Sequence, residues 1–207
     1  MFISFEGIEA AGKSTLIAAL VDDLRLAGGN VPLVTREPGG TAFGDVIRRI
    51  FLDPSNAIDP LAEVMLMNAS RAQLVADVVA PALREGRSVL CDRFFDATIA
   101  YQGYGRGLDV EMLLQVCLIA TRRGAPDLTF LLDLPAELSL ERLRARGASD
   151  RLEREDLAFH GRVRAGYLEL AQRFPGRFVV LDGTASAADV HARALDVLTR
   201  HTAWNRA

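Results

Sequence analysis

Cysteine and histidine are both scarce in this 207-residue sequence. The two cysteines, Cys91 and Cys117, lie far apart in apolar surroundings and form no Cys-x-x-Cys motif, so the sequence offers no disulfide framework. The three histidines are scattered without the spacing of zinc ligands, and we therefore predict no zinc site. Unpaired cysteines are typical of a reducing compartment, and we expect a cytoplasmic protein.

The sequence also lacks an excess of positive charge and any long apolar run. Its formal net charge is −3 and its pI is about 5.7, which argues against a generally basic surface for nucleic acid or membranes. No apolar segment approaches the roughly 20 residues that a membrane span needs. We therefore expect neither nucleic acid nor a membrane among its partners.

Apolar runs that predict buried strands alternate with segments of helical periodicity along the chain. The predicted strands cover residues 2–6, 31–35, 88–91, 128–132 and 178–181. The predicted helices cover residues 14–27, 41–52, 61–85 (with a kink near Pro81), 109–123, 136–144, 153–174 and 186–201. Continuously apolar strands that alternate with helices predict an α/β fold with a parallel sheet covered on both faces. The length fits one domain over residues 1–207.

Lysine is the scarcest charged residue. Of the 24 basic residues, Lys13 is the single lysine and the other 23 are arginines. A general preference for arginine explains the depletion, but it does not explain where the remaining lysine lies. Lys13 belongs to a segment, residues 7–14, that matches G-x-x-x-x-G-K-[ST] between a predicted strand and a predicted helix. A compact ammonium suits a phosphate cradle better than a planar guanidinium does.

This phosphate-binding loop, or P-loop, predicts a nucleoside triphosphate site. Its glycines allow a tight turn in which backbone N–H groups point inward, and the dipole of the next helix favours phosphate oxygens. We expect Lys13 to contact the β- and γ-phosphates and the Ser14 hydroxyl to ligate Mg²⁺. The predicted ATP-binding residues are Gly7, Ile8, Glu9, Ala10, Ala11, Gly12, Lys13, Ser14 and Thr15.

Asp92 ends the third predicted strand, at the edge of the sheet where ligands bind in such folds. A carboxylate at this edge can hold Mg²⁺ directly or through water, so we predict Asp92 as a second metal ligand. The alternative is that Asp92 caps the helix that follows. The two roles are compatible with each other.

Two arginines, Arg36 and Arg93, follow the second and third predicted strands. The carboxyl ends of parallel strands meet at one edge of a sheet, so both arginines should lie beside the ATP phosphates. A lone arginine in a loop is usually a solvated surface residue. Two guanidinium groups at strand ends beside a P-loop instead favour a second phosphate, that of an acceptor, held by bidentate hydrogen bonds.

The segments FEGIEAAGKST, TREPGGT, DRFFDATIAYQG, PDLTFLLDLP and DRLE occur in this order between Phe5 and about Leu181. Together they resemble thymidylate kinase, in its bacterial form with a catalytic arginine in the lid. The resemblance implies a P-loop NTPase fold with a five-stranded parallel sheet of order 2-3-1-4-5, helices on both faces and a short arginine-rich lid. It also implies a homodimer that uses Mg²⁺ and transfers the γ-phosphoryl group of ATP to dTMP. The products, dTDP and ADP, belong to the biosynthesis of dTTP.

The same resemblance implies roles for individual residues in dTMP binding. Glu9 falls where a carboxylate contacts the sugar 3′-hydroxyl, and Arg36 and Arg93 fall where the dTMP phosphate is held. Arg71 is the expected donor to thymine O4. The remaining expected contacts to the base and the sugar come from Thr98, Gln102 and Tyr101. A negative charge in an anion-binding loop opposes ATP binding, which favours a Glu9 that faces the acceptor; the alternative is that Glu9 points to solvent.

Met67 lies where thymidylate kinases usually have a phenylalanine that stacks on thymine. Its i,i+4 spacing from Arg71 places both residues on one helical face, so both can meet one base. A thioether packs against an aromatic ring with an energy of about 0.3–1.5 kcal/mol. We therefore predict Met67 as a base contact. The alternative is that Met67 belongs to the core and that Phe43 or Phe94 covers the base.

The fourth predicted strand is followed by a stretch rich in arginine, Arg142, Arg144, Arg146 and Arg151. Related kinases have a lid here, at about residues 144–153, and a lid arginine can stabilise charge on the transferred phosphoryl group. We predict Arg146 and Arg151, on either side of Gly147, as the arginines that reach ATP. The alternative is an ordinary solvated helical face. The predicted catalytic residues are Lys13, Arg93, Arg146 and Arg151.

Two other functions compete with this interpretation. The first is another nucleotide or nucleoside kinase of the same fold, because a fold does not determine the acceptor. A nucleoside carries no phosphate, however, and would not require both Arg36 and Arg93. The second is a P-loop switch without a small acceptor. A GTPase would be expected to contain an N-K-x-D segment, and the single lysine is already used in the P-loop.

Overall fold

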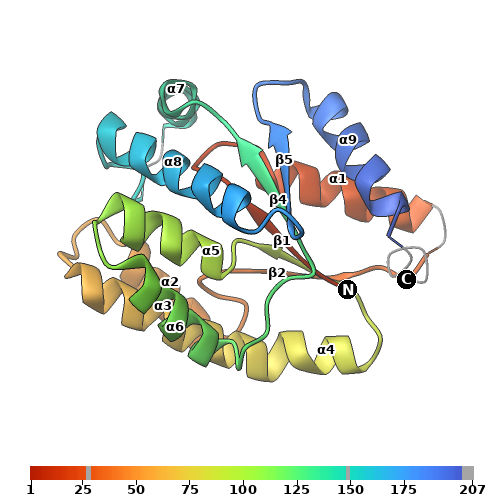
Figure 1. The fold of residues 1–207 in the computed structure, drawn as a ribbon, viewed down its shortest axis with the longest axis horizontal. Coiled ribbons are helices and arrows are strands. Elements are labelled where there is room, and N and C mark those ends of the chain that lie inside the picture. Colours follow the sequence, from red (N-terminus) through yellow and green to blue (C-terminus); the bar gives the residue numbers. More distant parts are fainter. Residues whose placement is uncertain (27–28, 148–149, 202–207) are drawn as a thin grey trace.

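A computed structural model of the protein describes residues 1–26, 29–147 and 150–201. Within these residues, one sheet contains the strands β1 (Phe2–Glu6), β2 (Leu33–Arg36), β3 (Val89–Asp92), β4 (Leu128–Asp133) and β5 (Phe178–Asp182). Neighbouring strands run parallel in the order β2-β3-β1-β4-β5 (Figure 1). The predicted α/β fold and strand order are confirmed.

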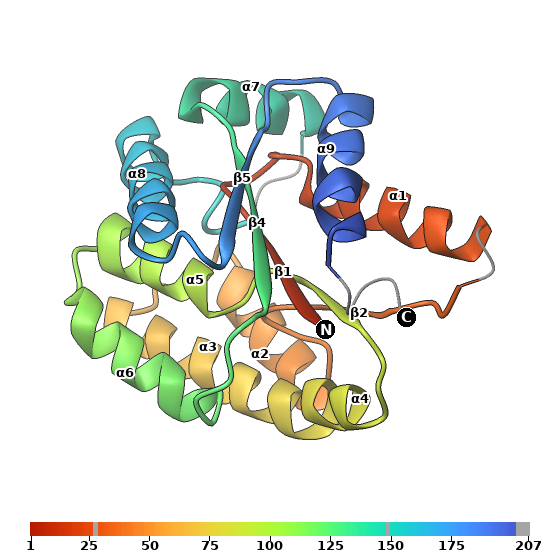
Figure 2. The ribbon, with the colours of Figure 1, turned by 45° about the vertical axis from the view of Figure 1, so that its right-hand side comes forward.

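Helices cover both faces of this sheet. The α-helices are α1 (Lys13–Leu26), α2 (Ala42–Leu52), α3 (Pro60–Leu74), α4 (Ala80–Arg84), α5 (Phe95–Thr98), α6 (Val110–Ala120), α7 (Ala136–Arg146), α8 (Leu157–Arg173) and α9 (Ala187–Thr199). Two π-helical segments, η1 (Val75–Val79) and η2 (Ile99–Gly105), continue α3 and α5. Figure 2 shows α1 and α9 on one face of the sheet, and α3, α5, α6 and α8 on the other. None of the described helices combines the length and hydropathy that a membrane crossing requires.

The central strand β1 explains why the strands read as apolar runs. All five of its residues are buried, and the Phe5 ring lies 5.6 Å from that of Phe130 on β4. A parallel strand between two helical layers has no solvated face, so apolar residues do not alternate with polar ones. Several helices begin where a side chain accepts a backbone N–H, at Thr41, Asp59, Asp109, Asp156 and Ser186.

Some boundaries differ from the prediction for identifiable reasons. Strand β2 begins at Leu33 rather than residue 31, because Pro32 has no N–H to donate to a neighbouring strand. The long helix predicted over residues 61–85 passes through the π-helical segment η1 just before Pro81, which lacks the regular helical N–H. Helix α8 begins at Leu157 rather than residue 153, because Asp156 is its N-cap. The end predicted for the first helix, at residue 27, lies outside the described residues.

The helical stretch formed by α5 and η2 was not predicted. It contains two glycines and no helical apolar periodicity, so the sequence gives no helix signal there. Its place is determined by α8, which packs tightly against it. A Cβ atom at Gly166 of α8 would lie 2.5 Å from the Tyr104 ring, and one at Gly105 of η2 would lie 2.7 Å from the Phe159 ring. These glycines therefore allow two elements that carry site residues to approach closely.

Candidate active site

A cavity of about 470 Å³ opens at the carboxyl edge of the sheet, beside the P-loop. Its walls come from the P-loop, the ends of β2 and β3 with the segments that follow them, the helical elements α2, α3, α5, η2 and α7, and the segment that contains Asp150 and Glu153. The cavity-lining residues that the sequence predicted are Glu9, Ala10, Ala11, Gly12, Lys13, Ser14, Thr15, Arg36, Met67, Asp92, Arg93, Tyr101, Gln102 and Arg146. The cavity therefore brings most of the predicted donor-site and acceptor-site residues together.

The P-loop turns sharply between β1 and α1. Gly7 has φ +134° and Gly12 has φ +100°, and a Cβ atom at Gly7 would lie 2.5 Å from the Leu132 carbonyl oxygen. Only glycine fits such a position. The Lys13 ammonium folds back into the loop and donates to the carbonyl oxygens of Gly7 (3.1 Å) and Ile8 (3.0 Å). The loop thus holds its lysine at the cavity wall.

The environment of Lys13 lowers the pKa of its ammonium to about 8. Burial is the main cause, and the nearby positive charge of Arg93 acts in the same direction. Asp92 and Glu9 oppose the shift without cancelling it. A polyanion in the cavity would favour the charged ammonium and so reverse part of this shift.

Ser14 and Asp92 lie together at the cavity wall, where the Ser14 hydroxyl donates to the Asp92 carboxylate at 2.9 Å. A hydroxyl and a carboxylate are hard oxygen donors of the kind that Mg²⁺ prefers. The described residues hold no cluster of three or more His, Cys, Asp or Glu that could bind a metal ion. The alternative helix-cap role for Asp92 is wrong, since α5 begins after Phe94 without a side-chain cap.

Arg93 connects the end of β3 to the P-loop. Its guanidinium donates to the Gly7 carbonyl oxygen (2.7 Å), the Tyr167 hydroxyl (3.0 Å) and the Glu9 carboxylate (3.1 Å). It also lies over the Tyr101 ring, 5.0 Å from the centroid. Among the described residues, these three hydrogen bonds use neither the Nε–H nor the second N–H of Nη2, so Arg93 can still bind an anion.

Two more arginines line the same cavity. Arg36 is half exposed and lies 3.8 Å from Asp45, while Arg48 of α2 donates to the Pro38 carbonyl oxygen at 3.0 Å. Burial, and then the positive charge of Arg36, lower the pKa of Arg48. Arg48 was not among the site residues predicted from the sequence. The only signal in the sequence was that Arg48 follows Ile47 in the predicted helix directly after the TREPGGT segment.

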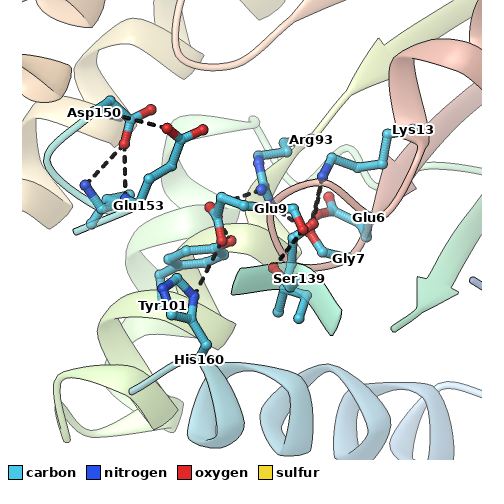
Figure 3. Close-up of polar contacts among 12 residues, drawn as sticks. Glu6, Gly7, Glu9, Lys13, Arg93, Tyr101, Ser139, Asp150, Glu153 and His160 are labelled. Atoms are coloured by element: carbon cyan, nitrogen blue, oxygen red, sulfur yellow. Dashed lines mark hydrogen bonds and ion pairs between the residues drawn. The ribbon is translucent and has the colours of Figure 1, made fainter. Parts of the chain in front are cut away.

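Glu9, a residue of the P-loop, is buried. The alternative that its side chain points to solvent is therefore wrong. Figure 3 shows its carboxylate between Arg93, Tyr101 and His160. The Tyr101 hydroxyl donates to Glu9 Oε1 at 2.5 Å. Burial alone would raise the pKa of Glu9, but Arg93, His160, Lys13 and Tyr101 together outweigh burial and lower the pKa to about 2.

Arg71 and Thr98 do not line the cavity. Arg71 is fully buried and donates to Glu37 (2.8 Å), Asn68 (2.9 Å) and Thr98 (2.9 Å). Its carboxylate partner Glu37 does line the cavity, as does Met67 one helical turn away. The contact predicted between Arg71 and a base stays a prediction. Gly7 and Ile8 also lie outside the cavity wall.

The lid arginines differ in their surroundings. Arg146 lines the cavity, is largely exposed and pairs with Glu153. Arg151 does not line the cavity, because it donates to the carboxylate of Glu63 (2.5 Å) and to the Phe51 carbonyl oxygen (3.0 Å). Residues 148 and 149 of the expected lid lie outside the described residues.

Helix α7 supports the P-loop in a way that the sequence did not reveal. The buried Ser139 hydroxyl donates to the Glu9 carbonyl oxygen at 2.7 Å (Figure 3), and Arg142 donates to the Ala10 carbonyl oxygen at 3.1 Å. Arg142 also lines the cavity. It is therefore more than a solvated residue of a helical face. The i,i+3 spacing of the two side chains places both on the face of α7 that meets the loop.

The strand order, the P-loop and the second cluster of cationic side chains define a P-loop phosphotransferase of the nucleotide-kinase class. A family model described as thymidylate kinase matches residues 5–194. The chain belongs to the thymidylate kinase family.

Individual relatives agree over nearly full length. The chain is 53% identical to a thymidylate kinase of Trichlorobacter lovleyi over 97% of this chain and 98% of the relative. It is 51% identical to a thymidylate kinase of Deinococcus radiodurans over 93% of each. A crystal structure of thymidylate kinase from Ehrlichia chaffeensis superposes with a TM-score of 0.78 at 32% identity, over 96% of this chain and 98% of the other.

The lowered pKa of Lys13 can be measured directly, because Lys13 is the only lysine. Only the free amine reacts with an amine-directed label, so we expect the labelling rate of Lys13 to level off near pH 8 in the folded protein. The same residue in urea-unfolded chain should level off near an ordinary pKa of about 10.4. Peptide mapping separates Lys13 from the amino terminus. Identical folded and unfolded profiles would contradict the described environment.

Proposed function

We propose that this protein transfers the γ-phosphoryl group of ATP to dTMP and so produces dTDP and ADP for dTTP synthesis. The observation that carries the proposal is one cavity with a P-loop on one side and three arginines on the other, in a chain of the thymidylate kinase family. A donor and an acceptor phosphate bound in this cavity would meet directly. Such proximity is a large part of phosphoryl-transfer catalysis.

The donor side would be formed by the P-loop, residues 7–15. Lys13 would contact the β- and γ-phosphates, and the loop amides and the start of α1 would bind the remaining phosphate oxygens. We propose that Ser14 and Asp92 hold Mg²⁺ together with ATP, which is supported by their 2.9 Å contact. When bound, the ion neutralises phosphate charge.

The acceptor phosphate would be bound by Arg36, Arg48 and Arg93. Burial, and then the positive charge of Arg36, lower the pKa of Arg48, so part of this shift reflects repulsion among the cationic side chains around the cavity. A phosphate dianion would relieve that repulsion, whereas a nucleoside without a phosphate would leave it in place. The three arginines therefore favour a nucleoside monophosphate over a nucleoside.

Met67, Gln102, Tyr101 and Glu9 line the part of the cavity where the thymidine moiety would lie. We propose that Met67 and Gln102 contact the base, that Tyr101 packs against the sugar and that Glu9 accepts a hydrogen bond from the sugar 3′-hydroxyl. The contacts of Glu9 with Arg93 and Tyr101 support this role, because they keep the side chain ionised and oriented. Arg71 and Thr98 would act on the base from behind this wall.

The arginine-rich segment, residues 144–153, would close over ATP as a lid on the domain formed by residues 1–207. Arg146 already faces the cavity, and Arg151 would have to leave Glu63 to reach it. We propose that one or both stabilise charge on the transferred phosphoryl group. Arg142 would hold the P-loop throughout, since its partners are the backbone oxygens of Ala10 and Gly183.

Two copies of the chain would associate through the apolar faces of α2, α3 and α6. The exposed apolar side chains on these helices are Phe43, Val46, Ile50, Leu61, Met65, Met112 and Ile119. Helix α3 packs against both α2 and α6, so the three helices lie side by side (Figures 1 and 2). Exposed apolar patches of this kind favour a protein interface.

Two free, buried thiols, Cys91 and Cys117, support a reducing, cytoplasmic location.

The acceptor is tested by an ADP-release assay with dTMP, dUMP, UMP, CMP, AMP, thymidine or no acceptor. We expect the highest kcat/KM with dTMP, and loss of turnover when Mg²⁺ is chelated. Lys13→Ala should abolish turnover at an unchanged melting temperature. Turnover of another monophosphate but not dTMP would reject the assignment, and equal ADP release without an acceptor would indicate a switch or ATPase.

Met67 tests the base contact. We expect Met67→Ala to raise the KM for dTMP by about three- to tenfold, because a contact of about 0.3–1.5 kcal/mol and some packing are lost. The KM for ATP should not change. Met67→Phe should keep or improve dTMP turnover, because a rigid ring gives a comparable contact of about 0.5–1.5 kcal/mol. An unchanged KM for dTMP in Met67→Ala would place Met67 in the core alone.

The dimer is tested by sedimentation velocity. We expect the chain to sediment at about twice its 22.5 kDa mass. Phe43→Glu should give monomers, because it places a charge in the apolar face of α2. Leu26→Glu is the matched control, since Leu26 is also exposed but lies on α1, on the opposite side of the sheet. A wild-type chain that sediments as a monomer at micromolar concentration would exclude the proposal.

A further inference from the structure

The two carboxylate oxygens of Glu9 have different partners. Oε1 accepts hydrogen bonds from the Tyr101 hydroxyl (2.5 Å) and from Arg93 (3.1 Å). Oε2 is buried and accepts no hydrogen bond from any described residue. The nearest ring nitrogen is His160 Nδ1, which lies 3.4 Å away on the far side of the carboxylate from Arg93 (Figure 3).

His160 is itself fully buried, and neither of its ring nitrogens has a hydrogen-bond partner among the described residues. An unpaired buried donor is destabilising, so an imidazole normally finds a hydrogen-bond partner inside a protein. Glu9 Oε2 lies just beyond hydrogen-bond distance. A shift of a few tenths of an ångström would give both atoms a partner.

The position of His160 is set by packing rather than by the cavity. It lies in the first turn of α8, which begins at the Asp156 cap. The close approach of α8 to η2 at Gly105 and Gly166 fixes this helix against the segment that carries Tyr101. His160 and Tyr101 therefore meet the Glu9 carboxylate from two rigidly packed elements.

Three other charged groups lie near Glu9. Arg93 and Lys13 supply positive charge that favours the ionised carboxylate, and Asp150 is a negative charge nearby. His160 does not line the cavity, so it cannot contact a ligand there. The role left for His160 is to orient the Glu9 carboxylate.

We propose that His160 is a positioning residue that sets acceptor-hydroxyl selectivity through Glu9. Its Nδ1–H donates to Oε2, and this bond holds the Glu9 carboxylate in one orientation at the cavity wall, which Glu9 lines. In that orientation the carboxylate accepts the hydrogen bond of the acceptor's sugar hydroxyl. The inference rests on the proposed function, because it requires Glu9 to meet that hydroxyl.

The test compares dTMP with 3′-deoxy-dTMP, which lacks only the hydroxyl. In the wild-type enzyme we expect kcat/KM to favour dTMP by about ten- to a hundredfold, as a hydrogen bond to a charged group does. His160→Leu should reduce this ratio at least fivefold, mainly through the KM for dTMP. His160→Asn should keep it within about threefold, because Asn is nearly isosteric with Leu but places an N–H close to the Nδ1 position.

Two controls separate positioning from folding. His160→Gln moves the donor to the Nε2 position and should lose selectivity as Leu does, which keeps the test valid if the Leu variant unfolds. Val163→Ala removes buried volume from the same helix without touching Glu9. It should lower the melting temperature and leave the dTMP to 3′-deoxy-dTMP ratio unchanged.

A double-mutant comparison distinguishes the ways the idea can fail. Glu9→Ala should bring the ratio close to one, and His160→Leu should then cause no further loss. A Glu9→Ala enzyme with the wild-type ratio would reject the Glu9–hydroxyl contact and the inference with it. If the dTMP to 3′-deoxy-dTMP ratio falls to about one in Glu9→Ala but stays at the wild-type value in folded His160→Leu and His160→Gln, only the role of His160 is overturned. Equal losses in Asn and Leu would show packing rather than a hydrogen bond.

Discussion

The contacts of Arg93 hold the two sides of the site together. Its backbone has φ +69°, a conformation that costs a residue with a side chain about 1–2 kcal/mol and that turns the chain at the end of β3 toward the P-loop. The guanidinium repays this cost with hydrogen bonds to Gly7, Glu9 and Tyr167. The same charge lowers the pKa of both Lys13 and Glu9. The P-loop and the segment that follows β3 thus share one electrostatic centre.

Beneath this centre lies a buried acid, Glu6, at the end of β1. It accepts hydrogen bonds from the Phe94 backbone N–H (2.6 Å) and the Tyr167 hydroxyl (2.8 Å). Burial, and then the negative charge of Asp96, raise the pKa of Glu6. A buried carboxylate is costly unless its oxygens are bonded, and here both are. The bonds tie the strand before the P-loop to the loop after β3 and to α8, so the cavity rests on a polar network that a change at Tyr167 would disturb.

The parts of the site that lie within one segment could be predicted from the sequence, and the parts that depend on packing could not. The P-loop around Lys13 was predicted because its spacing alone carries the chemistry. The positions of the strand ends followed from apolar runs, which correctly brought Arg36 and Arg93 to one edge. Arg142 and Arg48 were missed as cavity residues, because nothing in their own segments shows that a distant backbone oxygen will hold them. The burial of Arg71 likewise depends on Glu37, 34 residues earlier in the chain.

The packing of α8 on η2 makes two glycines of one helix very unequal in the changes they can accept. At Gly166 any side chain would enter the Tyr104 ring, whereas a Cβ atom at Gly161 meets nothing within 4 Å. A substitution at Gly161 would therefore change stability very little, and alanine there would even favour the helix. A substitution at Gly166 would push α8 away from η2. It would therefore separate side chains that are in contact in the fold although they lie far apart in the sequence. Mutational tolerance along this helix is thus set residue by residue, by the distance to the neighbouring element rather than by exposure to the substrate.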